Sequence, residues 1–190
     1  MNKPTRPLHS KRRGFTLIEL MVTITVLAVL AAIALPSFTT LIKDTRLTTA
    51  TADIQTALNL ARSESVMRRQ AVAVCMSADG ASCGGTSWQS GLLVFTNNSA
   101  NGTYTLGTDQ PLRYIQLTDA ALTVSAVSSP AATSNVFGGK NYVLFMPTGR
   151  PANAGALLLC DDRTGAFGHE VMVSVVGRTE TVQKLNCPNS

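Results

Sequence analysis

An uncharged run near the N-terminus constrains this 190-residue chain more than any other feature. From Leu20 to Ile42 there is no Asp, Glu, Lys or Arg, and this exceeds the roughly 20 apolar residues with which a helix crosses a bilayer. Basic residues stand directly before the run, which predicts a cytoplasmic N-terminus and a downstream part on the other side of the membrane. Two alternatives remain open, namely a buried core helix and a secretory signal cleaved near Ala31-Ala32-Ile33-Ala34.

The net charge of +5 comes from the same N-terminal segment. Five of the 16 basic residues precede Gly14, and the other 11 balance the 11 acidic residues. Everything after Gly14 is therefore formally neutral and has no bulk electrostatic attraction for nucleic acid. A hydrophobic content of 45% with only 14% charged residues also excludes a disordered chain.

Glu19 is a lone carboxylate at the start of the apolar run, where an ionisable group is costly and usually functional. The segment around it, KRRGFTLIEL at 11–20, resembles the class III signal of type IV pilins and type II secretion pseudopilins. The resemblance implies that residues 1–14 are a cytoplasmic leader. A dedicated prepilin peptidase and N-methyltransferase would cut between Gly14 and Phe15, and would methylate Phe15 at its new N-terminus.

A role for Glu19 in assembly follows from the chemistry of the cleaved end. Cleavage would expose a cationic α-amino group at Phe15, close to the membrane. In a filament, Glu19 could neutralise the amine of its own subunit or of a neighbour, because either charge is costly to leave unpaired at low dielectric. The alternative is an interfacial carboxylate that water satisfies.

Helical periodicity continues beyond the apolar run. Small or apolar residues recur at three- to four-residue spacing, at Leu47, Ala50, Ile54, Ala57, Leu58, Ala61 and Ser65. This predicts one helix from Phe15 to about Arg69, with residues 15–42 as the transmembrane and filament-core half and 43–69 as an amphipathic half. Pro36 predicts a kink, because it lacks an N–H and crowds the preceding turn. A separate helix beginning near Asp44 is the alternative.

After Gln70 the pattern changes to short apolar runs between Gly, Asn and Ser. The predicted strands are 71–76, 92–95, 112–117, 122–127, 142–145, 156–159 and 171–176, with a turn at 97–102 and a longer loop at 128–139. We therefore predict an α+β class and a type IV pilin fold, in which the helix packs on the mostly antiparallel β-sheet of a periplasmic head at 70–190.

The four cysteines, Cys75, Cys83, Cys160 and Cys187, all lie downstream of the predicted span, where disulfides can form. Three connectivities are possible. We favour Cys75–Cys83, which closes a small loop, and Cys160–Cys187, which ties back the C-terminal tail. Metal binding is the rival, but there is no CxxC pair and His169 has no evident ligand partner.

Three further segments resemble the GspH/FimT group of minor pilins and pseudopilins. They are Trp88-x-x-Gly91 before Val94-Phe95, then Phe145-x-Pro147-x-Gly149-Arg150, then Gly177-Arg178. Structural roles explain them most simply, with Trp88 and Phe145 in the core and Gly149 and Gly177 in turns. Residues 61–65 are expected to dock the helix on the sheet.

No motif indicates an enzyme, and no cofactor is expected. The adjacent carboxylates Asp161 and Asp162 are expected in a solvated loop. The resemblance implies a minor pilin of the inner membrane that helps initiate and assemble a type IV pilus, with other minor pilins and the major pilin as partners. The alternative is a GspH-like minor pseudopilin of a type II protein secretion system.

DNA binding for natural transformation is the lower-ranked alternative. Some FimT-like pilins bind DNA through a Gly-Arg-x-Arg motif, and positions 177–180 read Gly-Arg-Thr-Glu here. Glu180 would repel phosphate, so weak binding is expected. Arg178 and Lys184 are the candidate DNA contacts, as a local basic patch.

Overall fold

The computed structural model describes residues 14–117, 121–127, 137 and 140–187. Most of the predicted leader and of the loop at 128–139 lies outside these residues. The chain divides into two compact units, one up to Ile42 and one from Lys43 onward, which we call the head. The first unit contains the N-terminal part of helix α1 (Leu17–Arg68), and the head contains the rest of that helix together with all the strands.

Helix α1 is continuous, so the alternative of a separate helix starting near Asp44 is wrong. Pro36 lies within it, and the kink there stays a prediction. In the head, the seven predicted stripe residues from Leu47 to Ser65 are all buried. Thr51 is also buried, and its hydroxyl donates to the carbonyl of Leu47 at 2.6 Å, which satisfies it inside the core.

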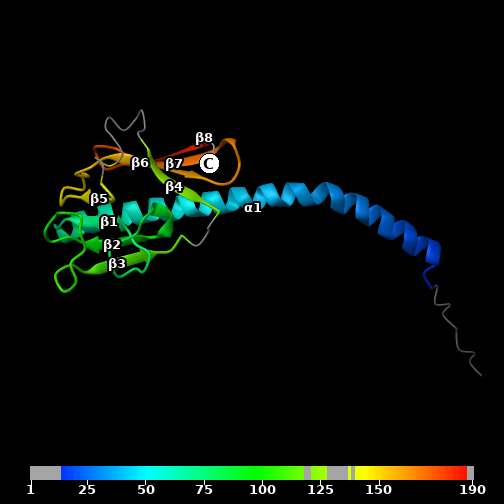
Figure 1. Ribbon diagram of the computed structural model, residues 1–190, viewed down its shortest axis with the longest axis horizontal. Coiled ribbons are helices and arrows are strands. Elements are labelled where there is room, and N and C mark those ends of the chain that lie inside the picture. Colours follow the sequence, from blue (N-terminus) through cyan, green and yellow to red (C-terminus); the bar gives the residue numbers. More distant parts are fainter. Residues whose placement is uncertain (1–13, 118–120, 128–136, 138–139, 188–190) are drawn as a thin grey trace, which may run out of the picture. The chain divides into compact units, whose positions relative to one another are not determined.

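Among the described residues, eight strands form two four-stranded antiparallel sheets (Figure 1). The first has the order β3-β2-β1-β5, from Pro111–Ile115, Leu92–Thr96, Val72–Met76 and Tyr142–Phe145. The second has the order β4-β6-β7-β8, from Thr123–Val127, Gly155–Cys160, Gly165–Val173 and Thr179–Cys187. A short 3₁₀ helix, η1 (Trp88–Ser90), precedes β2.

The predicted helix on antiparallel β-structure is confirmed, but its division into two sheets was not predicted, because strand pairing across the chain is not encoded in local patterns. Strand β8 was not predicted, since its exposed sequence TETVQKLNC contains only two large apolar residues. Strand β7 begins at Gly165 and ends at Val173 instead of spanning 171–176. Residues 174–178 form a turn instead, in which the N–H of Gly177 donates to the carbonyl of Ser174 at 2.8 Å.

The main core lies where the head's part of α1 meets one face of each sheet. It joins the helix stripe to inward residues such as Val74 of the first sheet and Leu157 of the second. Leu58 at its centre is 1% exposed, and full burial of such a side chain contributes about 1.5–3 kcal/mol. A second cluster, with Phe95 at its centre, fills the opposite face of the first sheet. The head is thus held by apolar contacts on both faces of that sheet.

The structural roles predicted for the family-like segments are confirmed. Trp88 and Phe145 are buried in the main core. Gly149 and Gly177 have φ values of +74° and +81°, a left-handed conformation that favours glycine. Between residues 61 and 65, Ala61 and Ser65 are fully buried and hold the helix end on the head.

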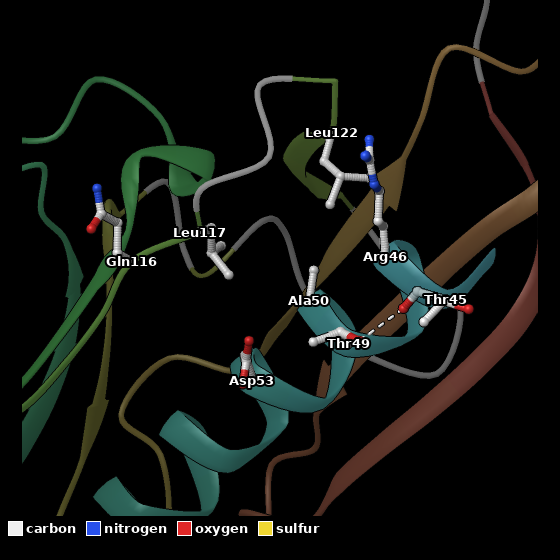
Figure 2. Close-up of a pocket in the computed structure, with 8 residues that line it drawn as sticks. All are labelled: Thr45, Arg46, Thr49, Ala50, Asp53, Gln116, Leu117 and Leu122. Carbon is white, nitrogen blue, oxygen red and sulfur yellow. Dashed lines mark hydrogen bonds between the residues drawn. The ribbon is translucent and has the colours of Figure 1, made fainter. Parts of the chain in front are cut away.

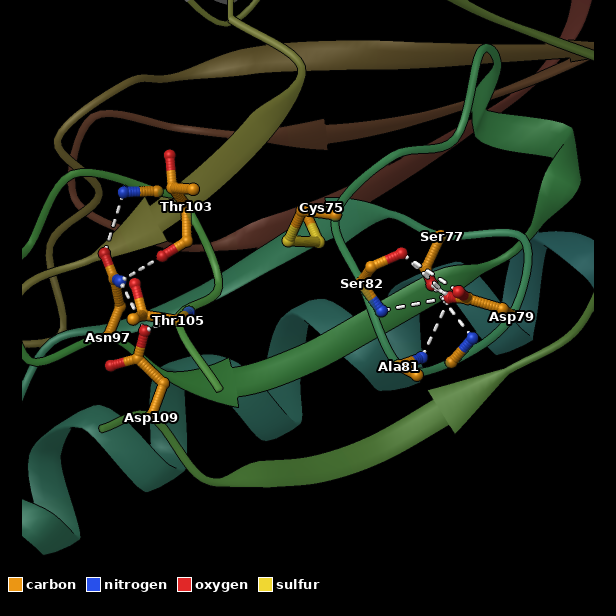
Figure 3. Close-up of a disulfide and its surroundings, with 12 residues drawn as sticks. Cys75, Ser77, Asp79, Ala81, Ser82, Asn97, Thr103, Thr105 and Asp109 are labelled. Carbon is orange, nitrogen blue, oxygen red and sulfur yellow. Dashed lines mark hydrogen bonds between the residues drawn. A yellow bond between two sulfur atoms is a disulfide. The ribbon is translucent and has the colours of Figure 1, made fainter. Parts of the chain in front are cut away.

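The structure contains two disulfides, Cys75–Cys83 and Cys160–Cys187, the same pairs that the sequence favours. The first closes the loop after β1 (Figure 3). The second joins the ends of β6 and β8 and so fastens the C-terminal strand to its sheet.

Candidate functional site

The N-terminal end of α1 carries the residues that the class III signal singles out. Thr16 precedes the helix, and its hydroxyl oxygen accepts a hydrogen bond from the N–H of Glu19 at 3.2 Å, as an N-cap residue does. Glu19 lies in the first turn, where the helix dipole favours a carboxylate. Glu19 is exposed and Phe15 is 75% exposed, so both could reach a neighbouring molecule.

Gly14 is not required by the fold. A Cβ placed on Gly14 would have no atom within 4 Å. Steric demands of the folded chain therefore do not explain a glycine at this position. A demand from a processing enzyme, which must bring its own groups close to the backbone, remains a sufficient reason.

From Leu20 to Ile42 the helix carries no charged side chain. An 18-residue window has a mean hydropathy of 2.5, long and apolar enough to cross a membrane, and it is unburied. The hydroxyls of Thr23 and Thr25 donate to the carbonyls of Leu20 and Val22, each at 2.8 Å, so these side chains are satisfied within the helix, as a lipid environment requires. The alternative of a buried core helix is wrong for this segment.

Ion pairs fix the start of the head's helix. The prediction of a solvated loop holds for Asp162, which is exposed, and is wrong for Asp161, which is buried. Lys43 contacts Asp162 at 2.7 Å, and Arg163 contacts Asp44 at 2.8 Å. Arg163 also donates to buried Asp161 at 2.6 Å. The turn between β6 and β7 thus binds the first residues of the head's helix. The two pairs with the helix join residues 119 positions apart, which local sequence cannot reveal.

The ion pairs and burial shift the pKa values of three residues in this region. Burial raises the pKa of Asp161, but hydrogen bonds from Arg163 outweigh it and the net pKa is lowered. The same hydrogen bond raises the pKa of Arg163. Burial lowers the pKa of His169, whose Nδ1 lies 3.2 Å from the hydroxyl of Thr51. His169 is thus packed against the helix, and the described residues contain no group of three or more His, Cys, Asp or Glu placed to hold a metal.

The candidate DNA contacts lie apart. Arg178 precedes β8 and Lys184 lies within it, both exposed. Their Cα atoms are six residue steps apart, or about 20 Å along an extended strand. Glu180 lies 4.0 Å from Arg178, so a carboxylate accompanies the first of the two cations. They do not form one basic patch.

A pocket of about 440 Å³ lies beside the head's helix (Figure 2). It is lined by Thr45, Arg46, Thr49, Ala50, Asp53, Gln116, Leu117 and Leu122. The hydroxyl of Thr49 donates to the carbonyl of Thr45 at 2.9 Å, so its hydrogen is already bonded within the helix. The lining mixes single polar groups with apolar ones and presents no catalytic constellation.

The loop closed by Cys75–Cys83 is organised by a carboxylate (Figure 3). Asp79 accepts hydrogen bonds from the N–H groups of Ala81 and Ser82 at 2.9 and 3.0 Å. The bond from Ala81, with the others, lowers the pKa of Asp79 to about 2. Nearby, buried Asp109 accepts from the N–H of Thr105 at 2.9 Å. Both carboxylates stabilise the conformation of their loops by accepting backbone hydrogen bonds.

The family follows from comparison with known proteins. The family profile described as "Type II transport protein GspH" matches residues 50–177, more than half of the chain. The chain belongs to the GspH family. The profile of the "Prokaryotic N-terminal methylation motif" matches residues 9–35. Among curated proteins, none matches the chain.

Solved structures of the type IV minor pilin FimU from Pseudomonas aeruginosa share 20% sequence identity with this GspH-family chain. One covers 78% of this chain and 96% of FimU with a TM-score of 0.55, and a second crystal form covers 76% and 98% with a TM-score of 0.52. The minor pseudopilin EpsH of the Vibrio cholerae Type 2 Secretion System covers 73% of this chain and 97% of EpsH, at 12% identity and a TM-score of 0.48. The likeness to FimU confirms the predicted fold, a long N-terminal helix with antiparallel sheets.

The chain is thus a minor pilin or a GspH-like pseudopilin, and the comparisons favour neither. The family is one of structural pilins and pseudopilins. The methylation motif implies processing by a prepilin peptidase and assembly with other pilins. The apolar N-terminal helix fits anchoring in a membrane.

Proposed function

We propose that this protein is a structural filament subunit, a minor pilin that helps to initiate and assemble a type IV pilus from the inner membrane. Before assembly its N-terminus is cytoplasmic and its head periplasmic. Prepilin peptidase cuts after Gly14 and methylates Phe15. Other minor pilins and the major pilin then receive the subunit.

One observation carries the proposal. The helix from Leu17 to Ile42 is exposed on all sides, although it is the most apolar part of the chain. Burial of that surface is worth about 25 cal/mol per Å², so the segment needs a lipid bilayer before assembly and the helices of other subunits after it. An exposed Glu19 at its start supplies a carboxylate for the amine of a processed neighbour.

Glu19→Ala tests the assembly role in cells that express the full-length chain. We expect normal cleavage and normal abundance in the membrane, with at least a tenfold loss from sheared filaments, because a buried amine would lack its counter-charge. Asp53→Ala is the matched control, since it removes a carboxylate from the head's part of the helix. Normal incorporation of Glu19→Ala would contradict the role.

The choice between pilus and secretion system needs a second readout. Deletion of the gene should reduce surface pili and leave the secretion of exoproteins unchanged. Loss of secretion with normal pili would identify the alternative, a GspH-like minor pseudopilin. Expression of the wild-type chain from a plasmid should restore whichever process is lost.

A further inference from the structure

Exposed apolar side chains of the head gather at one place. Among its described residues, eight large hydrophobic side chains are highly exposed: Val66, Met67, Leu106, Met146, Phe167, Val175, Val176 and Val182. Four of these, Val66, Met146, Val175 and Val176, lie where the end of α1 meets two turns, and we call these four residues the valine patch. Clustered exposed apolar residues on a soluble domain indicate an interaction surface, whereas scattered ones need no explanation.

Arg62 and two glycines hold the segments of the valine patch together. A Cβ on Gly149 would lie 2.9 Å from Val66, so the turn after β5 packs directly on the helix. A Cβ on Gly177 would lie 2.2 Å from the carbonyl oxygen of Gly149, so the two turns touch. Arg62 donates to the carbonyl of Val176 at 3.4 Å. The three segments of the chain that carry the patch are therefore in contact with one another.

The patch is also preorganised. In the first turn, the N–H of Gly149 donates to the carbonyl of Met146 at 2.8 Å. In the second, the N–H of Ser174 donates to the carbonyl of Arg178 at 2.9 Å. A surface whose backbone is already fixed loses little conformational entropy on binding, which favours affinity.

Basic side chains surround the valine patch. Arg150 and Arg178 are exposed and Arg62 is half-buried, all within the same three segments. Arg and Met are enriched at protein interfaces, and a positive rim is complementary to carboxylates on a partner. An apolar centre with a cationic rim therefore fits a protein surface with an apolar centre and an acidic rim.

Nucleic acid fits the same surface less well. Glu180 lies 4.0 Å from Arg178 and adds a carboxylate beside one of the three cations. Phosphate contacts dominate the affinity for nucleic acid, and the exposed apolar side chains at the centre of the patch make none. A protein partner makes use of both the centre and the rim.

We infer that the valine patch docks the acidic, apolar-centred face of a neighbouring subunit's head within the filament. This inference rests on the proposed filament function, and it adds a specific face of the head to the contacts made by the N-terminal helix.

Val176→Asp tests the inference in the full-length chain. A carboxylate at the centre of the patch should reduce incorporation into sheared filaments at least tenfold, while cleavage, membrane abundance and the melting temperature of the head stay close to wild type. Val182→Asp is the matched control, because Val182 is 43% exposed on β8 against 51% for Val176, outside the patch. It should incorporate within twofold of wild type.

Charge reversal and cross-linking identify the partner's chemistry. Arg150→Glu should impair incorporation, whereas Arg113→Glu on the exposed face of β3 should not. A photo-cross-linker at position 176 should capture a peptide of another filament subunit that contains Asp or Glu beside apolar residues. Cross-links to nucleic acid, or equal incorporation of the Val176→Asp variant and wild type, would overturn the inference. Absence of the wild-type chain from filaments would instead overturn the filament function itself.

Discussion

The two parts of α1 differ in what surrounds their apolar residues. From Leu17 to Ile42 the large hydrophobic side chains are 49 to 77% exposed, whereas the stripe from Leu47 to Ala61 is at most 6% exposed. The first part carries apolar residues all round and the second only on one face. Hydrophobicity alone therefore does not predict burial in this chain. The spacing of apolar residues distinguishes the part that packs in the head from the part that we propose to serve a bilayer and other subunits.

The largest effect is expected from Gly14→Val, which would test the processing of the exposed part. A branched side chain at the scissile bond should block cleavage completely, because the peptidase must approach the backbone closely. Immunoblots should show the unprocessed protein in the membrane and none in sheared filaments. The head should still fold and form both disulfides, because Gly14 lies outside the compact unit that forms the head.

Ala34→Val is the control for this experiment. It alters the small-residue segment that a secretory signal peptidase would use, and it should leave cleavage unchanged. Blocked cleavage in Ala34→Val, with normal cleavage in Gly14→Val, would replace the class III interpretation by a secretory signal.

Paired truncations of leucine compare the two parts of the helix directly. Leu58→Ala leaves a cavity in the main core and should lower the free energy of unfolding of the head by about 2–5 kcal/mol. Leu30→Ala, at a position 60% exposed, should change it by less than about 0.5 kcal/mol. Urea denaturation of the full-length chain in detergent, followed by Trp88 fluorescence, measures both. Equal destabilisation would show that the first part also belongs to the core of the head.

The disulfide that closes the longer loop should contribute more to the stability of the head. Loss of Cys160–Cys187, with a separation of 27 residues, should cost about 3.5 kcal/mol on the chain-entropy account. Loss of Cys75–Cys83, with a separation of 8, should cost about 2.5 kcal/mol. Paired Cys→Ser variants and thermal melts provide the measurement. A larger loss from the short loop would show that local geometry outweighs chain entropy here.

The smallest of these effects is expected from acid, which should lower the stability of the head through Asp79. The folded-state pKa of Asp79 is lowered to about 2, so its contribution is present above its ordinary pKa near 3.8 and is lost as the pH falls from about 4 to 2. Asp79→Asn should flatten the stability profile of the head in that window. Asp53→Asn, on the helix, is the control. If the stability of Asp79→Asn fell between about pH 4 and 2 as steeply as that of the wild type, the role of this loop carboxylate would be contradicted.

The helix could be predicted from the sequence and much of the sheet arrangement could not. Spacing from Leu47 to Ser65 predicts the buried stripe. The short separation of Cys75 and Cys83 favours their pairing, which leaves Cys160 and Cys187 to fasten the C-terminal tail. Strand β8 was not predicted because its side chains are mostly exposed. The division into two sheets was not predicted because it depends on pairings between distant segments. The contacts of Asp162 and Arg163 with the helix and the valine patch were not predicted for the same reason, since both arise only when separate segments meet.

The mass of the mature N-terminus tests the central claim most directly, namely that one helix is processed at Gly14 and serves the membrane, the filament and the head. Protein from sheared filaments should be digested and its N-terminal peptide sequenced by mass spectrometry. The account predicts a peptide that begins at N-methylated Phe15. A peptide that begins at Met1, or directly after Ala34, would contradict it.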